Sequence, residues 1–180
     1  MSKKKIRNMG VYLVLGFVTV MMFAFCQEAK AEVTLEVGPT FLSGELAKGG
    51  NLSITERWGG PYGSRYAVGI GYISEQEVLP TWEASQGLPA VELRENLYVH
   101  AQRRVSFKMK GCPDWDCISL GVGAAYFNDT NRAIGSNFSA SLSIEVRPSK
   151  HWSLSIRHFS NAGSSTPNMG QDMLLLGYTF

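Results

Sequence analysis

The feature that most constrains this 180-residue chain is an alternation of apolar and polar residues with a period of two. It is clearest from Ser136 to Arg147, where Phe138, Ala140, Leu142, Ile144 and Val146 alternate with Asn, Ser, Glu and Arg. Successive side chains of a β-strand point to opposite faces of the sheet. The pattern therefore predicts strands with one apolar face and one polar face.

Eight segments of roughly ten residues share this alternation, and turn-forming or polar stretches separate them. They are residues 33–41, 51–58, 64–74, 93–107, 118–126, 136–147, 151–160 and 171–180. An even number of such strands favours a closed antiparallel barrel, because closure pairs every backbone N–H and C=O group. Eight strands enclose an interior that side chains fill, so an open pore is excluded.

The polar face distinguishes a membrane barrel from a soluble barrel of the lipocalin type, which has the same period. A soluble exterior would carry many Lys and Glu residues. Here the polar face is mostly Ser, Gly, Ala and Asn, with a few charges at Arg57, Arg94, Arg104, Glu145, Arg147 and Arg157. These residues suit a narrow, hydrogen-bonded interior. We therefore expect an all-β fold, an eight-stranded antiparallel transmembrane β-barrel with its apolar face against lipid.

The first 31 residues have the three regions of a secretory signal peptide. Basic residues at 1–7 precede an apolar run at 11–26, and Ala29 and Ala31 form an Ala-x-Ala cleavage site. A retained anchor is the alternative, but 16 apolar residues fall short of the roughly 20 that a spanning helix needs. We expect removal of residues 1–31 and a mature barrel of residues 32–180.

Cys112 and Cys117 are the two cysteines of the mature chain. In an oxidising periplasm we expect them to form a disulfide bond. Two cysteines without a nearby His make no zinc site, so we expect no metal. With 17 Lys and Arg against 15 Asp and Glu, the chain lacks the basic surface that a nucleic-acid partner requires.

Three polar residues fall on the apolar face near one end of the predicted barrel. His158 and Ser160 end the seventh segment, and Asp172 opens the eighth. With both chain termini in the periplasm, these residues lie at the outer rim, facing lipid. Polar groups there are costly unless they are paired, which favours a functional role. The alternative is that they are ordinary rim residues at the level of the lipid headgroups.

The three residue types are those of a serine hydrolase triad. Ser160 is the candidate nucleophile, His158 the base and Asp172 the group that orients the imidazole. Asn161 and Asn168 are candidate donors to the oxyanion, beside backbone N–H groups of residues 162–165. This chemistry needs no cofactor.

Residues 157–162 (Arg-His-Phe-Ser-Asn-Ala) and 167–172 (Pro-Asn-Met-Gly-Gln-Asp) resemble the signature of the PagL-type lipid A 3-O-deacylases. The resemblance implies an eight-stranded barrel of the Gram-negative outer membrane, with its active site toward the outer leaflet. It also implies hydrolysis of the 3-O-linked acyl chain of lipid A, with lipopolysaccharide and outer-membrane lipids as partners. The family motif matches His158 as base, Ser160 as nucleophile and Asp172 as acid. It has Glu at the last position, and because Asp172 is shorter by one methylene, a looser contact with His158 is the expected consequence.

Two other functions are compatible with a small barrel. A non-catalytic barrel for adhesion or envelope stability would favour several long outer loops, whereas only residues 75–90 form a long one. A lipid A acyltransferase barrel would hold an acyl chain in its interior, which the charged interior predicted here opposes. The sequence leaves open whether the barrel forms a homodimer, which acyl length it prefers and how activity is regulated.

Overall fold

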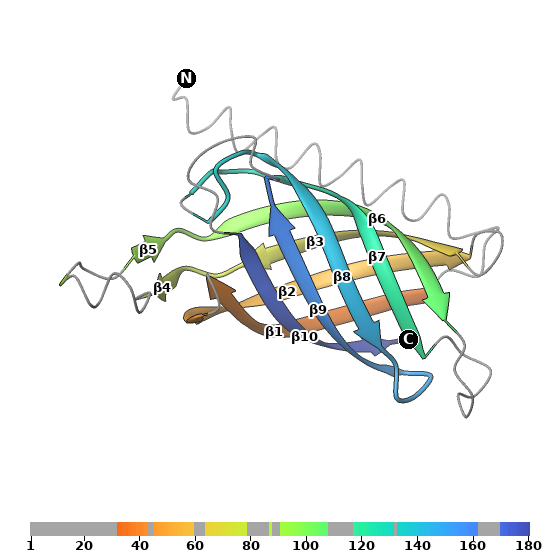
Figure 1. Cartoon of the computed structure of the whole chain (residues 1–180). Coiled ribbons are helices and arrows are strands. Elements are labelled where there is room, and N and C mark those ends of the chain that lie inside the picture. Colours follow the sequence, from red (N-terminus) through yellow and green to blue (C-terminus); the bar gives the residue numbers. More distant parts are fainter. Residues whose placement is uncertain are drawn as a thin grey trace, which may run out of the picture. The chain divides into compact units, whose positions relative to one another are not determined.

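The protein is an antiparallel β-barrel in a computed structural model that describes residues 32–42, 45–59, 64–78, 87, 91–107, 117–131, 133–161 and 170–180 (Figure 1). Its described strands are β1 (Glu32–Leu42), β2 (Glu45–Gly59), β3 (Ser64–Ile73), β4 (Gln76–Val78), β5 (Val91–Leu93), β6 (Asn96–Phe107), β7 (Ile118–Phe127), β8 (Phe138–Val146), β9 (Trp152–Ser160) and β10 (Gln171–Thr179). The barrel closes in the order β1-β10-β9-β8-β7-β6-β3-β2, and β4 and β5 form a separate two-stranded sheet. The predicted eight-stranded antiparallel barrel is confirmed. We call the end where β9 stops and β10 begins the loop end, and the opposite end the terminus end.

The strand register is offset along the strands after one circuit of the barrel, and this offset sets the relative heights of residues on neighbouring strands. Lateral partners followed from Leu97 of β6 through β3, β2, β1, β10, β9, β8 and β7 return to β6 at Phe107, ten residues away. For eight strands this stagger corresponds to a tilt of about 40° from the barrel axis. A row of lateral partners therefore climbs toward the loop end from β6 to β10, by about 3 Å per strand.

Burial on the barrel wall is the inverse of that in a soluble protein. Large apolar side chains on the outside are exposed, among them Val122 (60%), Ile156 (54%) and Leu142 (49%). The inside is lined by buried Thr, Ser, Gln, Glu and Arg side chains. An apolar exterior and a polar interior are the pattern of a transmembrane barrel. Among the described residues, no helix is long and apolar enough to cross a membrane.

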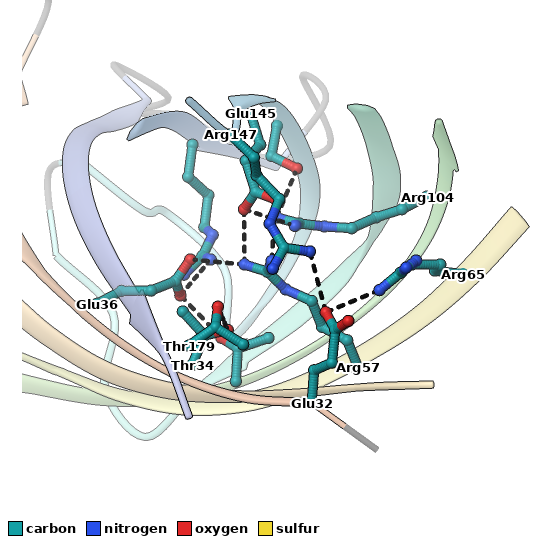
Figure 2. A network of polar contacts seen from close by, with 12 residues as sticks. Glu32, Thr34, Glu36, Arg57, Arg65, Arg104, Glu145, Arg147 and Thr179 are labelled. Atoms are coloured by element: carbon teal, nitrogen blue, oxygen red, sulfur yellow. Dashed lines mark hydrogen bonds and ion pairs between the residues drawn. The ribbon is translucent and has the colours of Figure 1, made fainter. Parts of the chain in front are cut away.

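The charges inside the barrel pair with one another (Figure 2). Glu145 accepts hydrogen bonds from Arg57 at 2.6 and 2.9 Å and from Arg104 at 2.9 Å. Glu36 accepts one from Arg157 at 2.6 Å and others from interior hydroxyl groups. At the terminus end, Arg65 and Arg147 both reach Glu32. Buried charges are tolerated because each has an opposite charge and hydrogen bonds.

Three details of the sequence prediction are wrong. Arg94 is exposed in the connection between β5 and β6 and does not line the interior. Leu93 belongs to β5 rather than to the long strand. Residues 94 and 95 lie in neither strand, and β6 begins to pair with β3 only at Asn96. β2 begins at Glu45, inside the predicted polar break at 43–50, because backbone pairing with β1 continues past a register shift between Pro39 and Phe41.

Two predictions fall on residues outside the described ranges. Residues 1–31, predicted to be a signal peptide, lie outside them, and so does Cys112. Cys117 is disulfide-bonded, and its pairing with Cys112 stays a prediction.

Candidate active site

At the end of β9, alternate residues point to opposite sides of the barrel wall, and the candidate catalytic residues are on the outer side. Arg157 and Phe159 point into the barrel and are fully buried, whereas His158 and Ser160 point outward and are partly exposed. The Arg157 guanidinium binds the Glu36 carboxylate. The Phe159 ring packs edge-on against Tyr98 and Phe127, with centroids 5.1 Å apart in both pairs. The buried residues thus hold the backbone from which His158 and Ser160 project.

His158 and Asp172 are direct lateral partners of β9 and β10. The imidazole Nδ1 lies 2.7 Å from Oδ1 of the carboxylate, and the two side chains are 38% and 37% exposed. Lateral partners in antiparallel strands hold their Cβ atoms about 4.5–5.5 Å apart. At that spacing the short side chain of Asp172 reaches the imidazole. The structure therefore brings these two candidates together.

Ser160 lies two residues beyond His158 on the same face of β9 and is a lateral partner of Ala140 in β8. It is the last residue of the strand. Asn161 follows it and is 4% exposed. Asn168 lies outside the described residues. The described part of the chain contains no group of three or more His, Cys, Asp or Glu side chains placed to hold a metal ion.

Gly170, the residue directly before β10, lies against the imidazole of His158. Its φ angle is +74°, in the left-handed region that favours glycine. A Cβ atom there would lie 2.8 Å from Cε1 of His158. The Gly170 N–H donates to the carbonyl oxygen of Ala133 at 3.1 Å, which fixes its position. The sequence motif contained Gly170 but did not suggest this packing against the imidazole.

A groove of about 800 Å³ leads away from His158 along the outer wall of the barrel. One side is a row of lateral partners, namely Arg103, Val122, Leu142 and His158 on β6, β7, β8 and β9. The other side is the parallel row of Val105, Leu120, Ile144 and Ile156, two residues nearer the terminus end, and Phe107 continues the lining further along β6. Gly121 and Ser143 lie between the rows. We call this feature the wall groove.

Arg103 is a residue that sequence reasoning missed. It occupies an outward-facing position of β6 between the apolar residues Ala101 and Val105, and it is exposed. A charge on the apolar face of the alternation was the signal that would have found it. It lies in the same row of lateral partners as His158, and both residues line the wall groove.

The family model described as "Lipid A 3-O-deacylase (PagL)" matches residues 49–180, a range that contains all the candidate site residues. The curated lipid A deacylase PagL of Bordetella bronchiseptica is 40% identical over 70 residues, which cover 35% of this chain and 39% of that relative. The match thus spans less than half of the relative's length. Among solved structures, the outer membrane enzyme PagL is 19% identical, with a TM-score of 0.45 and coverage of 83% of this chain and 98% of that chain. The Yersinia pestis outer membrane protein Ail is 13% identical, with a TM-score of 0.43 and coverage of 83% and 99%.

Proposed function

Since the chain belongs to the lipid A 3-O-deacylase (PagL) family, we propose that it is an outer-membrane esterase that hydrolyses the 3-O-linked acyl chain of lipid A. The observation that carries this proposal is the 2.7 Å contact between His158 and Asp172 on the lipid-facing side of the barrel, with Ser160 on the same face. A polar pair on an apolar wall would otherwise be a cost without a benefit to the fold.

The proposed reaction follows from the roles that these groups can take. With Asp172 on Nδ1, the Nε2 atom of His158 is the basic nitrogen that takes the proton from Ser160. The Ser160 Oγ attacks the ester carbonyl, and collapse of the tetrahedral intermediate expels the sugar hydroxyl, which His158 protonates. A water molecule, deprotonated by His158, then releases the acyl chain from Ser160. Asp172 stays ionised and stabilises the imidazolium.

Donors to the oxyanion complete the proposed site. We assign this role to Asn161 and Asn168, which both lie in the connection between β9 and β10 in sequence. A replacement of either amide that lowers the rate without changing substrate binding would support the assignment. The Asn168 variant is the more informative test, because Asn161 is buried and its loss would also disturb packing.

The membrane itself would deliver the substrate. Aromatic side chains flank the exposed apolar band at both ends, with Tyr126 and Phe138 at the loop end and Trp152, Tyr178 and Phe180 at the terminus end. Such girdles mark the two membrane interfaces. His158, Ser160 and Asp172 lie near the loop-end girdle, which we assign to the outer leaflet. Lipid A could reach them by lateral diffusion, with its acyl chain along the wall groove.

Mass spectrometry of lipid A from cells with and without this protein tests the proposal. We expect loss of one ester-linked hydroxyacyl chain with the wild-type protein. Ser160→Ala should lower the rate by roughly 10⁴-fold or more, while the barrel stays folded. If the wild-type protein removes no acyl chain, the esterase proposal fails and a non-catalytic barrel becomes the better account. If Ser160→Ala stays active, the nucleophile is wrong.

The mature protein would begin at Glu32, after cleavage of residues 1–31 by signal peptidase. The intact mass of the protein purified from outer membranes tests this boundary. A mass that includes residues 1–31 would contradict it.

A further inference from the structure

We propose that Asn131, in the connection between β7 and β8, is a positioning residue for His158 and fixes its imidazole through one backbone peptide and Gly170. The inference rests on the proposed esterase function, because the geometry that it protects is that of the proposed triad. It gives a role to a connection other than the one that carries Asn161 and Asn168.

The side chain of Asn131 ties a turn. Its Oδ1 atom accepts hydrogen bonds from the backbone N–H groups of Ala133 at 2.8 Å and Ile134 at 2.9 Å. Its own backbone N–H donates to the Ile134 carbonyl oxygen at 3.0 Å. Asn and Asp suit such a position, because their short side chains accept hydrogen bonds from backbone N–H groups a few residues further along the chain. The Oδ1 atom therefore sets the shape of the turn.

One peptide unit connects this turn to the candidate active site. The carbonyl group of Ala133 and the N–H group of Ile134 belong to the same peptide unit, which is planar. Its N–H group donates to Asn131, and its carbonyl oxygen accepts a hydrogen bond from the Gly170 N–H at 3.1 Å. A rotation of the plane at the Asn131 end therefore moves the acceptor at the Gly170 end.

Gly170 supplies a second constraint on the imidazole of His158. The 2.7 Å contact between Nδ1 and Asp172 holds one edge of the ring but leaves the ring free to turn about that contact. Gly170 lies so close to Cε1 that a Cβ atom there would be 2.8 Å from it. Because Cε1 lies between the two ring nitrogens, this packing sets the direction of Nε2, the proposed base.

Water is a poor substitute for the Asn131 side chain, because the turn is buried. Ala133 is fully buried and Ile134 is 1% exposed, and both belong to the apolar cluster that contains Phe127 and Phe159. Two buried N–H groups without an acceptor are unfavourable. Loss of the Asn131 side chain should therefore turn the peptide toward another acceptor and loosen the support of Gly170.

The first test is kinetic and uses purified mature protein in phospholipid vesicles that contain lipid A, with acyl release measured by mass spectrometry. Asn131→Ala should lower kcat by at least about tenfold and leave KM within about twofold, because position rather than binding is lost. Asn131→Asp keeps an oxygen acceptor and should have a kcat within about threefold of wild type.

Asn137→Ala is the matched control. The Asn137 side chain donates to the Phe127 carbonyl oxygen at 2.8 Å, so it also ties the connection between β7 and β8. It makes this bond at the base of the connection, away from the peptide that holds Gly170. Its loss should leave kcat within about twofold of wild type. Thermal unfolding checks that both Ala variants are folded.

The second test observes the imidazole directly by NMR and needs no enzyme activity. In histidine-labelled protein, the resonances of Cε1–H and of the Nδ1 proton report the orientation of the His158 ring. They should shift or broaden in Asn131→Ala and match wild type in Asn131→Asp and Asn137→Ala. His151, which stacks on Tyr178 at the terminus end, is the internal control and should keep its resonances in every variant.

The two tests separate this inference from the proposed function. If the wild-type protein releases no acyl chain, the esterase proposal fails, and the His158 resonances still decide whether Asn131 orients the ring. In an active enzyme, Asn131→Ala with wild-type kcat, or with unchanged His158 resonances, refutes the inference. Equal losses of kcat in Asn137→Ala and Asn131→Ala, or no recovery in Asn131→Asp, refute it as well.

Discussion

Replacement of Gly170 by Ala should reduce activity much more than stability. The added Cβ would lie 2.8 Å from Cε1 of His158 and 3.5 Å from the Phe159 carbonyl oxygen. Ordinary carbon–carbon contacts are about 3.5–4.0 Å, so the imidazole must move by about 1 Å. The imidazole is the free end of a side chain and can move with little cost to the barrel. The left-handed backbone adds about 1–2 kcal/mol for a residue with a Cβ.

The functional cost is set by the geometry of the proposed triad. A displacement of about 1 Å at a catalytic group can lower a rate by about 100-fold. It would also lengthen or bend the 2.7 Å contact between His158 and Asp172. We therefore expect Gly170→Ala to lower the deacylation rate by about 100-fold. The assay is the initial rate of acyl release from lipid A, measured by mass spectrometry at equal concentrations of folded barrel.

Gly87 provides a matched control. Its φ angle is +70°, close to that of Gly170, and a Cβ there would meet nothing within 4 Å. Gly87→Ala carries the same backbone strain without contact with His158, so its rate should stay within about twofold of wild type. Equal rates for Gly170→Ala and Gly87→Ala would refute the idea that Gly170 positions the imidazole. Thermal unfolding of both variants checks that the barrels are equally stable.

Three other substitutions test the site and its supports. Asp172→Asn should lower the deacylation rate by roughly 10⁴-fold because the amide favours the wrong imidazole tautomer; an unchanged rate would make Asp172 a rim residue. Arg157→Met leaves Glu36 with a longer ion pair, to Arg57 at 3.7 Å, and should cost about 3–5 kcal/mol in unfolding free energy. The double variant with Glu36→Gln should recover much of that loss in urea titrations, and no recovery would contradict the pairing argument. Phe159→Ala removes a ring from the cluster with Tyr98 and Phe127 and should cost about 3–5 kcal/mol; a loss below about 1 kcal/mol would show that the cluster does not anchor β9.

The sequence was sufficient for the fold class and for the outward face of His158, Ser160 and Asp172. Alternation is a local property, since neighbouring residues of a strand point to opposite faces whatever the rest of the chain does. It therefore predicted an apolar outer wall, a polar interior and His158 with Ser160 on the outer face. The same reasoning was wrong at Arg94, because the barrel strand begins only at Asn96 and the residues before it belong to the separate β4–β5 sheet or its connection.

Only the tertiary structure decided which residues meet. The register between β9 and β10 sets His158 opposite Asp172, and the pairing of Glu36 with Arg157 joins residues 121 positions apart. The wall groove depends on the lateral alignment of four strands, and its descent from His158 to Arg103 depends on the ten-residue stagger of the whole barrel. These are collective properties of a closed sheet. A periodic sequence determines the faces of each strand, but closure and register determine which side chains lie side by side.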